Sequence, residues 1–124
     1  MSAARKYVEA IPVSLKSDPS LDEQWVKDLI SKNPSILGLG DEMRVIDAER
    51  RQSSGGRLDI LMHDSNTEKR YEVEVQLGKT DESHIIRTIE YWDLERKRDP
   101  HFDHCAVIVA EEITSRFFQR YCPF

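Results

Sequence analysis

The most constraining feature of this 124-residue sequence is a seven-residue segment, residues 71–77, in which apolar and polar side chains alternate strictly. Successive side chains of a β-strand point to opposite faces of a sheet, so this period of two predicts a strand. One face of the strand would be apolar and the other polar: Tyr71, Val73, Val75 and Leu77 against Glu72, Glu74 and Gln76. The chain must therefore place a hydrophobic layer against one side of this strand.

Helix-boundary and turn residues predict the elements that precede this strand. A capping box from Ser20 to Glu23 begins a helix, and Asn33-Pro34 ends it, because the residue before proline avoids the helical region. Two strands follow at residues 42–50 and 57–63. Segments 52–56 and 64–67, rich in glycine, serine, asparagine and aspartate, are expected to form the turns between the strands.

The second half of the chain predicts two helices with a strand between them. A long helix is expected from Thr80 or Asp81 to Arg98, with an apolar face made by Ile85, Ile86, Ile89 and Trp92. Residues 105–110 form a continuous apolar run, which indicates a buried strand, and residues 114–121 are expected to form a last helix. The order αβββαβα predicts an α/β (α+β-like) fold with a mixed sheet of about four strands flanked by helices.

Length and composition favour one cytoplasmic domain. Residues 1–20 are expected to be an irregular lead-in and residues 21–124 a single domain. The last residues of the sequence are apolar, which fits either a chain cut short or a buried C-terminus. Two cysteines without a CxxC pair predict reduced thiols rather than a disulfide framework or a zinc site. The N-terminus lacks the apolar core of a signal peptide, and no apolar run approaches the roughly 20 residues of a membrane span.

Carboxylates gather on the polar face of the alternating strand. If Ser65-Asn66 is the centre of the turn, Asp59 lies opposite Glu72, whereas a common bulge would place Asp59 opposite Glu74. Like charges at that distance repel, and a divalent cation such as Mg²⁺ or Mn²⁺ with oxygen ligands would neutralise them. The alternative is that the acids lie on a solvated face of an antiparallel sheet and have no function.

These residues resemble the PD-(D/E)XK nuclease superfamily, which has the restriction-endonuclease-like fold. Gly55-Gly56-Arg57-Leu58-Asp59 and then Glu74-Val75-Gln76, followed by a helix, are similar to its motif, and the element order matches its core over residues 21–110. The resemblance implies that Asp59, Glu74 and the carbonyl of Val75 bind the metal ion. It also implies that Gln76 orients the attacking water.

The resemblance implies further roles on the two helices. Glu23 is similar to the first-helix acid that assists metal or water binding, although it also fits the capping box. Arg57, Lys79, His84 and Arg87 are the expected nucleic-acid contacts, and Arg87 would also stabilise charge on the phosphate. Glu72 is expected to be either a second acid behind the site or a solvated side chain, and the latter is preferred.

The sequence departs from the superfamily pattern at two positions. Leu58 stands where proline often precedes the aspartate, and Gln76 replaces the motif lysine. Glutamine cannot act as a base or as a cation, so Lys79 or Arg87 would have to supply the missing charge. The departure leaves open a catalytically inactive binding or assembly module on the same fold.

The net charge of -5 excludes binding of nucleic acid by bulk electrostatics alone. Three of the negative charges would belong to the acidic face, where a divalent ion adds two positive ones. The preferred interpretation is therefore a Mg²⁺- or Mn²⁺-dependent nuclease domain that hydrolyses DNA, acting as a homodimer or with another domain or protein. A small structural protein with a wet acidic face is the third alternative.

Overall fold

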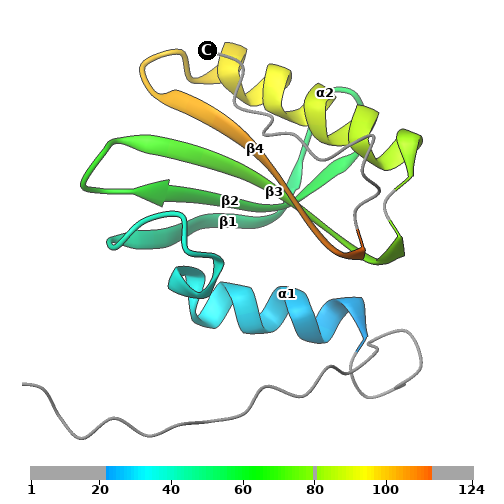
Figure 1. Ribbon diagram of the computed structural model, residues 1–124. Helices are drawn as coiled ribbons and strands as arrows, with labels where there is room; N and C mark the ends of the chain where they lie inside the picture. Colours follow the sequence, from blue (N-terminus) through cyan, green and yellow to red (C-terminus); the bar gives the residue numbers. More distant parts are fainter. Residues whose placement is uncertain (1–21, 80, 113–124) are drawn as a thin grey trace, which may run out of the picture.

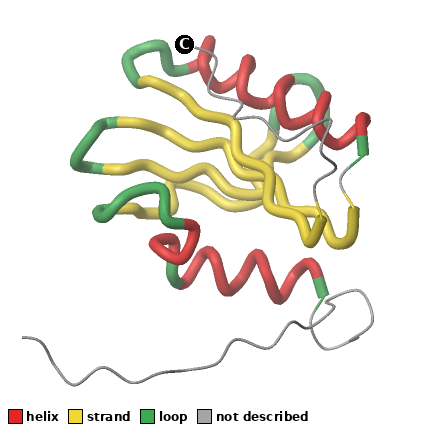
Figure 2. Tube along the Cα trace, in the orientation of Figure 1, coloured by secondary structure: helices red, strands yellow, loops and turns green. Residues whose placement is uncertain are grey.

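The computed structural model describes residues 22–79 and 81–112, which form one mixed sheet with a helix on each face (Figures 1 and 2). The elements, in chain order, are helix α1 (Glu23–Lys32), 3-10 helix η1 (Pro34–Leu37), strands β1 (Met43–Arg51), β2 (Arg57–Asp64) and β3 (Lys69–Lys79), helix α2 (Glu82–Arg98) and strand β4 (Asp103–Glu112). The mixed four-stranded sheet expected from the sequence is therefore confirmed. The expected lead-in at residues 1–20 and the last helix at 114–121 lie outside the described residues.

The strand order in the sheet is β1-β2-β3-β4. Both β1/β2 and β2/β3 are antiparallel pairs, as expected for strands joined by short turns, and β4 pairs parallel with β3 after the α2 crossover. β4 is thus the neighbour of β3 at one edge of the described sheet, and residues 107–110 are half-buried rather than fully buried. The alternating strand, β3, lies between two partners.

Side chains at the helix ends explain where the two helices begin. Asp22 caps α1 by accepting a hydrogen bond from the Trp25 N–H at 2.8 Å, so the expected capping box from Ser20 to Glu23 is wrong. Asp81, one of the two expected caps, accepts the His84 N–H at 2.8 Å at the start of α2. An aspartate in this position satisfies an amide that the helix itself cannot pair.

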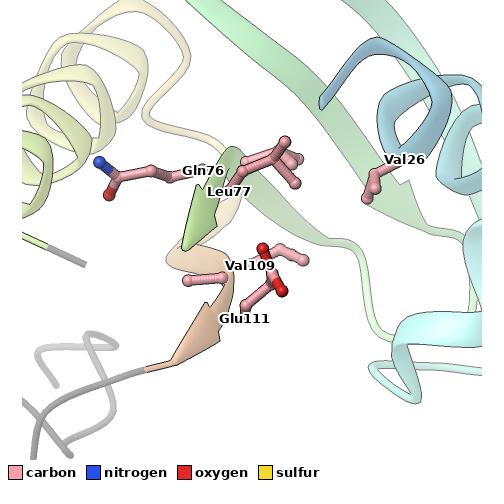
Figure 3. Close-up of a pocket in the computed structure, with 7 residues that line it drawn as sticks. Val26, Gln76, Leu77, Val109 and Glu111 are labelled. Atoms are coloured by element: carbon pink, nitrogen blue, oxygen red, sulfur yellow. The ribbon is translucent and has the colours of Figure 1, made fainter. Parts of the chain in front are cut away.

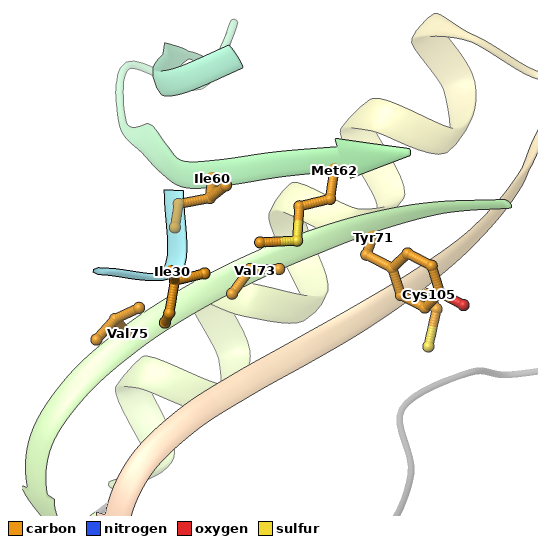
Figure 4. Close-up of a cluster of buried hydrophobic side chains, with 7 residues drawn as sticks. All are labelled: Ile30, Ile60, Met62, Tyr71, Val73, Val75 and Cys105. Atoms are coloured by element: carbon orange, nitrogen blue, oxygen red, sulfur yellow. The ribbon is translucent and has the colours of Figure 1, made fainter. Parts of the chain in front are cut away.

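The hydrophobic core lies between the sheet and α1 (Figure 4). β3 contributes the apolar half of its alternation to this core, and Ile30 of α1 covers it. The buried members of the cluster are Ile30, Ile60, Met62, Tyr71, Val73, Val75 and Cys105. The period of two in the sequence therefore predicts correctly that one face of β3 is a continuous apolar surface.

The opposite face of the sheet is packed against α2 by a mixture of polar and apolar side chains. The expected apolar face of α2 is wrong in part: Ile85 is buried, but Ile86 and Ile89 are exposed at 63% and 38%. The buried side chains of α2 are instead His84, Ile85, Thr88, Tyr91 and Glu95. The polar members of this set have partners of their own: Thr88 Oγ1 donates to the His84 carbonyl, and Oε2 of Glu95 accepts from Arg50 and Gln52 at 2.7 and 2.8 Å.

Glu72 is the clearest case of a buried acid on this face. It is fully buried, and its Oε2 lies 2.7 Å from Nδ1 of His104, whose other ring nitrogen contacts the Asp99 carbonyl at 2.8 Å. The preferred expectation that Glu72 is solvated is therefore wrong. Burial lowers the pKa of His104, but the hydrogen bonds to the Glu72 side chain and the Asp99 carbonyl, together with the charge of Glu72, outweigh this effect and the pKa is raised.

β1 contains an irregularity, and one further expectation is corrected. A bulge between Val45 and Asp47 shifts the register of β1, so that Ile46 packs against the α2 side and Asp47 is exposed. Cys105 is disulfide-bonded, contrary to the expectation of reduced thiols. No helix among the described residues is long and apolar enough to span a membrane.

Gly56, in the turn between β1 and β2, predicts a measurable packing constraint. A Cβ atom there would overlap the hydroxyl and ring of Tyr91, so we expect Gly56→Ala to destabilise the fold by about 1–3 kcal/mol. Urea unfolding measures this cost. In a Tyr91→Phe background the cost should shrink, because the overlapping hydroxyl is gone, and an equal cost in both backgrounds would contradict the contact.

Candidate active site

The candidate site lies where β2 and β3 part. The backbone pairing of these strands ends at Ile60 opposite Val73. Beyond that point two carboxylates take over the hydrogen bonds: the Asp59 N–H donates to Oε2 of Glu74, and the Val75 N–H donates to Oδ2 of Asp59, both at 2.8 Å. Asp59 and Glu74 therefore face each other across the two strands, as the second of the two sequence alternatives expected.

The turn, rather than a bulge, produces this register. β2 and β3 are joined by the four-residue loop 65–68, with Asp64 paired to Lys69 and Glu68 in the left-handed region at φ 58°. This loop is centred one residue later than the expected two-residue turn would give. The pairing therefore places Asp59 opposite Glu74 instead of Glu72.

Burial sets the electrostatics of the pair. Glu74 is only 3% exposed, and burial, followed by the charge of Asp59, raises the pKa of Glu74 to about 8. The Asp59 side chain is also largely buried, at 12% exposure. Two close carboxylates in such an environment cannot both ionise without a compensating cation.

Lys27 of α1 is the functional candidate that the sequence did not reveal. Its Nζ lies 3.0 Å from Oδ1 of Asp59, 3.3 Å from Oε1 of Glu49 and 4.0 Å from Oε1 of Glu23. Burial lowers the pKa of Lys27, but the hydrogen bond to Asp59 and the charges of Asp59 and Glu49 outweigh this effect, and the pKa is raised. The one signal in the sequence was the four-residue spacing of Glu23 and Lys27 on a helix, which does not point to Asp59.

Glu23 also lies beside β3. As the first residue of α1 it is free of the capping role expected for it, and its Oε2 accepts a hydrogen bond from the Leu77 N–H at 3.4 Å. Burial lowers the pKa of His84, and the charge of Glu23 is close enough to oppose this lowering in part. The structure thus brings this first-helix acid to the same end of the sheet as Glu74.

Gln76 projects from β3 toward α2, on the other side of the strand from Val26 (Figure 3). Its Nε2 donates to Oδ2 of Asp81 at 3.4 Å, and its Oε1 is buried without a hydrogen-bond partner. The amide therefore lies on the same face of β3 as Glu74, with one oxygen available to a further donor or to a cation.

Two of the expected nucleic-acid contacts lie on the first turns of α2. His84 is buried, and its Nδ1 lies 3.3 Å from Nη2 of the exposed Arg87. Burial and the Arg87 charge lower the pKa of His84, whereas the Arg87 charge favours the ionised form of Glu74. Arg87 is therefore the cation that α2 brings near Glu74.

The other two expected contacts are placed less closely. Arg57 is exposed at the start of β2, directly opposite the exposed Arg51, two residues before Asp59. Lys79 is the last residue of β3, and its side chain lies outside the described part of the structure. The nucleic-acid roles of these residues stay predictions.

A small pocket lies beside the site rather than in it (Figure 3). It encloses about 70 Å³ between α1 and the ends of β3 and β4, well below the roughly 300 Å³ of typical ligand pockets. Its walls are Val26, Val75, Gln76, Leu77, Val109, Ala110 and Glu111. The acids Asp59 and Glu74 do not line it.

The oxygen atoms at the site suit a hard divalent ion. Among residues 22–79 and 81–112, no three His, Cys, Asp or Glu side chains stand together as a ready metal-binding group. Burial and the charge of Asp59 nevertheless raise the pKa of Glu74, and the buried Oε1 of Gln76 has no partner. A carboxylate pair with additional amide and backbone oxygens is the donor set that Mg²⁺ and Mn²⁺ prefer, so the residues present fit such an ion.

Two solved structures have this fold. The chain is similar to a repair endonuclease from Pyrococcus abyssi, with a TM-score of 0.64, 19% identity, and coverage of 90% of this chain and 42% of that one. It is equally similar to EndoMS in a complex with dsDNA, with a TM-score of 0.65 and the same identity and coverage. No protein-family model and no curated protein matches the sequence.

This likeness confirms the fold that the resemblance implied. The chain has a restriction-endonuclease-like fold, with its mixed sheet and a helix on each face. It spans about two fifths of the length of the two matched chains. At 19% identity the likeness shows the fold alone, and the chemistry has to be argued from the site.

The raised pKa of Glu74 predicts a pH-dependent stability. Because the folded state keeps its proton up to about pH 8, wild-type stability should fall as the pH rises from about 5 to 8, whereas Glu74→Gln should lack this loss. The stability of Glu74→Gln relative to wild type should therefore grow by up to about 4 kcal/mol over this range. Urea unfolding of metal-free protein at several pH values measures it.

Glu42→Gln is the matched control, since Glu42 is an exposed glutamate outside the site. Its stability relative to wild type should stay constant over the same pH range. A Glu74→Gln difference that does not change with pH would contradict the buried, proton-retaining carboxyl.

Proposed function

We propose that this chain is a metal-dependent nuclease domain that hydrolyses phosphodiester bonds of DNA. The observation that carries the proposal is the Asp59–Glu74 pair, which replaces backbone pairing where β2 and β3 part on a fold shared with DNA endonucleases. Burying two facing carboxylates lowers stability unless a proton or a cation neutralises one of them, because their charges repel in a low-dielectric environment. The solvated acidic face of the third alternative is not what the structure has, since Glu72 and Glu74 are buried.

Asp59 and Glu74, with the backbone carbonyl of Val75, would hold Mg²⁺ or Mn²⁺. A bound ion of this type polarises a phosphate oxygen and lowers the pKa of a coordinated water. The chain's own contribution is to hold both carboxylates in place, and each is fixed by a 2.8 Å hydrogen bond from the backbone of the neighbouring strand.

The residues around the pair have separate roles in this proposal. Gln76, whose Oε1 is free, would accept a hydrogen bond from the attacking water and orient it. Arg87, exposed on α2 and electrostatically linked to Glu74, would stabilise negative charge on the phosphate. Glu23 would assist through a bound water, because it already reaches the end of β3 at Leu77.

Nucleic acid would approach the side of the molecule that carries Arg57 and Arg87. Arg57 and Arg87 are exposed, and we include the buried His84 and the Lys79 position at the end of β3 in the same proposed surface. One solved structure of this fold contains double-stranded DNA, which favours a DNA substrate. Because the chain spans 42% of that protein, a second subunit or a further domain would complete the DNA contact.

A second candidate function is a catalytically inactive binding or assembly module. Two observations favour it: Gln76 stands where the motif lysine is expected and donates to Asp81, and Lys27 neutralises Asp59. The two candidates differ in one respect, since only the nuclease needs both a bound metal ion and a hydrolysed substrate.

Calorimetric titration with Mn²⁺ and a cleavage assay test the proposal together. Wild type should bind Mn²⁺ and cut supercoiled or single-stranded DNA, and a chelator should abolish cleavage. Asp59→Asn and Glu74→Gln keep the shape of the side chains, and each should weaken Mn²⁺ binding by at least about tenfold and reduce cleavage to background. Glu42→Gln, the exposed control, should behave as wild type.

The outcomes separate the candidates. Binding of Mn²⁺ without cleavage of any DNA substrate would favour the inactive module over the enzyme. If wild type takes up no Mn²⁺ and leaves DNA intact, the nuclease proposal is wrong.

A further inference from the structure

The ammonium group of Lys27 is surrounded by carboxylates from three different elements. Glu23 comes from its own helix, Glu49 from β1 and Asp59 from β2, at 4.0, 3.3 and 3.0 Å from Nζ. The Lys27 side chain is 16% exposed. A monovalent cation is thus already held at the acidic end of the sheet, although its residue lies 32 positions before Asp59 in the sequence.

The backbone conformation of β1 at Glu49 is unusual, and the Glu49 carboxylate contacts Lys27. Glu49 has φ 52°, in the left-handed region that a non-glycine residue rarely adopts. Its carboxylate meets Lys27 while its side chain remains 43% exposed. A strained residue at such a contact suggests that the position of its side chain is functional.

Lys27 and a divalent ion would compete for the same carboxylate. Oδ2 of Asp59 accepts the Val75 N–H, and Oδ1 faces Nζ of Lys27, so both oxygens of Asp59 are engaged. A cation bound to Asp59 and Glu74 would lie within a few ångströms of the ammonium group, where two positive charges repel strongly. The carboxylate of Glu49, in contact with Nζ but more exposed than Asp59, offers the ammonium another partner.

We propose that Lys27 is an internal counter-cation that occupies Asp59 when no metal is bound and sets the metal affinity of the site. Binding of a divalent ion requires Nζ to leave Oδ1 of Asp59, and the flexible lysine side chain remains paired with Glu49 as it moves. This inference rests on the proposed metal site formed by Asp59 and Glu74. It assigns to α1 a control over that site that the motif residues themselves do not have.

Calorimetric titration of Lys27→Met with Mn²⁺ tests the proposal. The affinity for Mn²⁺ should rise by at least about tenfold over wild type, because the competing charge is gone while both proposed ligands remain. Lys32→Met is the matched control: it removes one positive charge from the exposed end of the same helix, and its affinity should stay within about twofold of wild type. Circular dichroism confirms that each variant is folded before titration.

Lys27→Gln keeps the test decisive if Lys27→Met does not fold. Its side chain is shorter and carries a neutral amide, so the charge beside Asp59 is removed and the affinity for Mn²⁺ should also exceed that of wild type. Lys27→Arg retains the charge and should remain close to wild type.

Each remaining outcome overturns the inference in a recognisable way. Equal Mn²⁺ affinity in wild type and Lys27→Met would show that Lys27 does not compete with the metal ion for Asp59, while the proposed metal site itself would stand. Weaker binding by Lys27→Met would reverse the role of Lys27, making it a residue that supports the ion. Absence of Mn²⁺ binding in both proteins would remove the metal site itself, and with it the proposed function.

Discussion

The structure depends on one exchange of hydrogen bonds between β2 and β3. Where the backbone ladder ends, Asp59 accepts the Val75 N–H and Glu74 accepts the Asp59 N–H, so side-chain oxygens satisfy amides that have lost their strand partners. The strands can therefore separate without leaving buried amides unpaired, which would cost free energy. The same exchange fixes two carboxylates face to face, and the proposed metal site depends on this fixed geometry.

Buried acids lie on the face of the sheet that α2 covers. Glu72 and Glu74 lie beneath the helix, and the helix meets them with a largely polar face that includes His84, Thr88 and Glu95, while Ile86 and Ile89 point to solvent. The partners of these two acids come from the neighbouring strands, since Glu72 contacts His104 of β4 and Glu74 accepts the Asp59 N–H of β2. The mixed polar and apolar layer between α2 and the sheet thus differs from the apolar layer between the sheet and α1 (Figures 1 and 4).

Much of the architecture follows from local chemistry that the sequence displays. The period of two in residues 71–77, the turn residues at 52–56, the proline at 34 and the aspartate at 81 predict the strands, the helix boundaries and their order. The motif around Asp59 and Glu74 also predicts the fold that the two endonuclease structures share. Periodicity fails at Ile86 and Ile89, because it counts hydrophobic residues and cannot register the acids beneath the helix.

The sequence by itself determined which residues form strands and helices and which acids share one face of β3, because these properties depend on neighbouring residues. Only the tertiary structure decided that Asp59 faces Glu74, because the length of loop 65–68 sets the register between the strands. Only the tertiary structure brought Lys27 to Asp59, because α1 must first dock its apolar side on the sheet before its lysine can reach β2. Contacts between residues far apart in the chain arise from packing, and no local pattern encodes them.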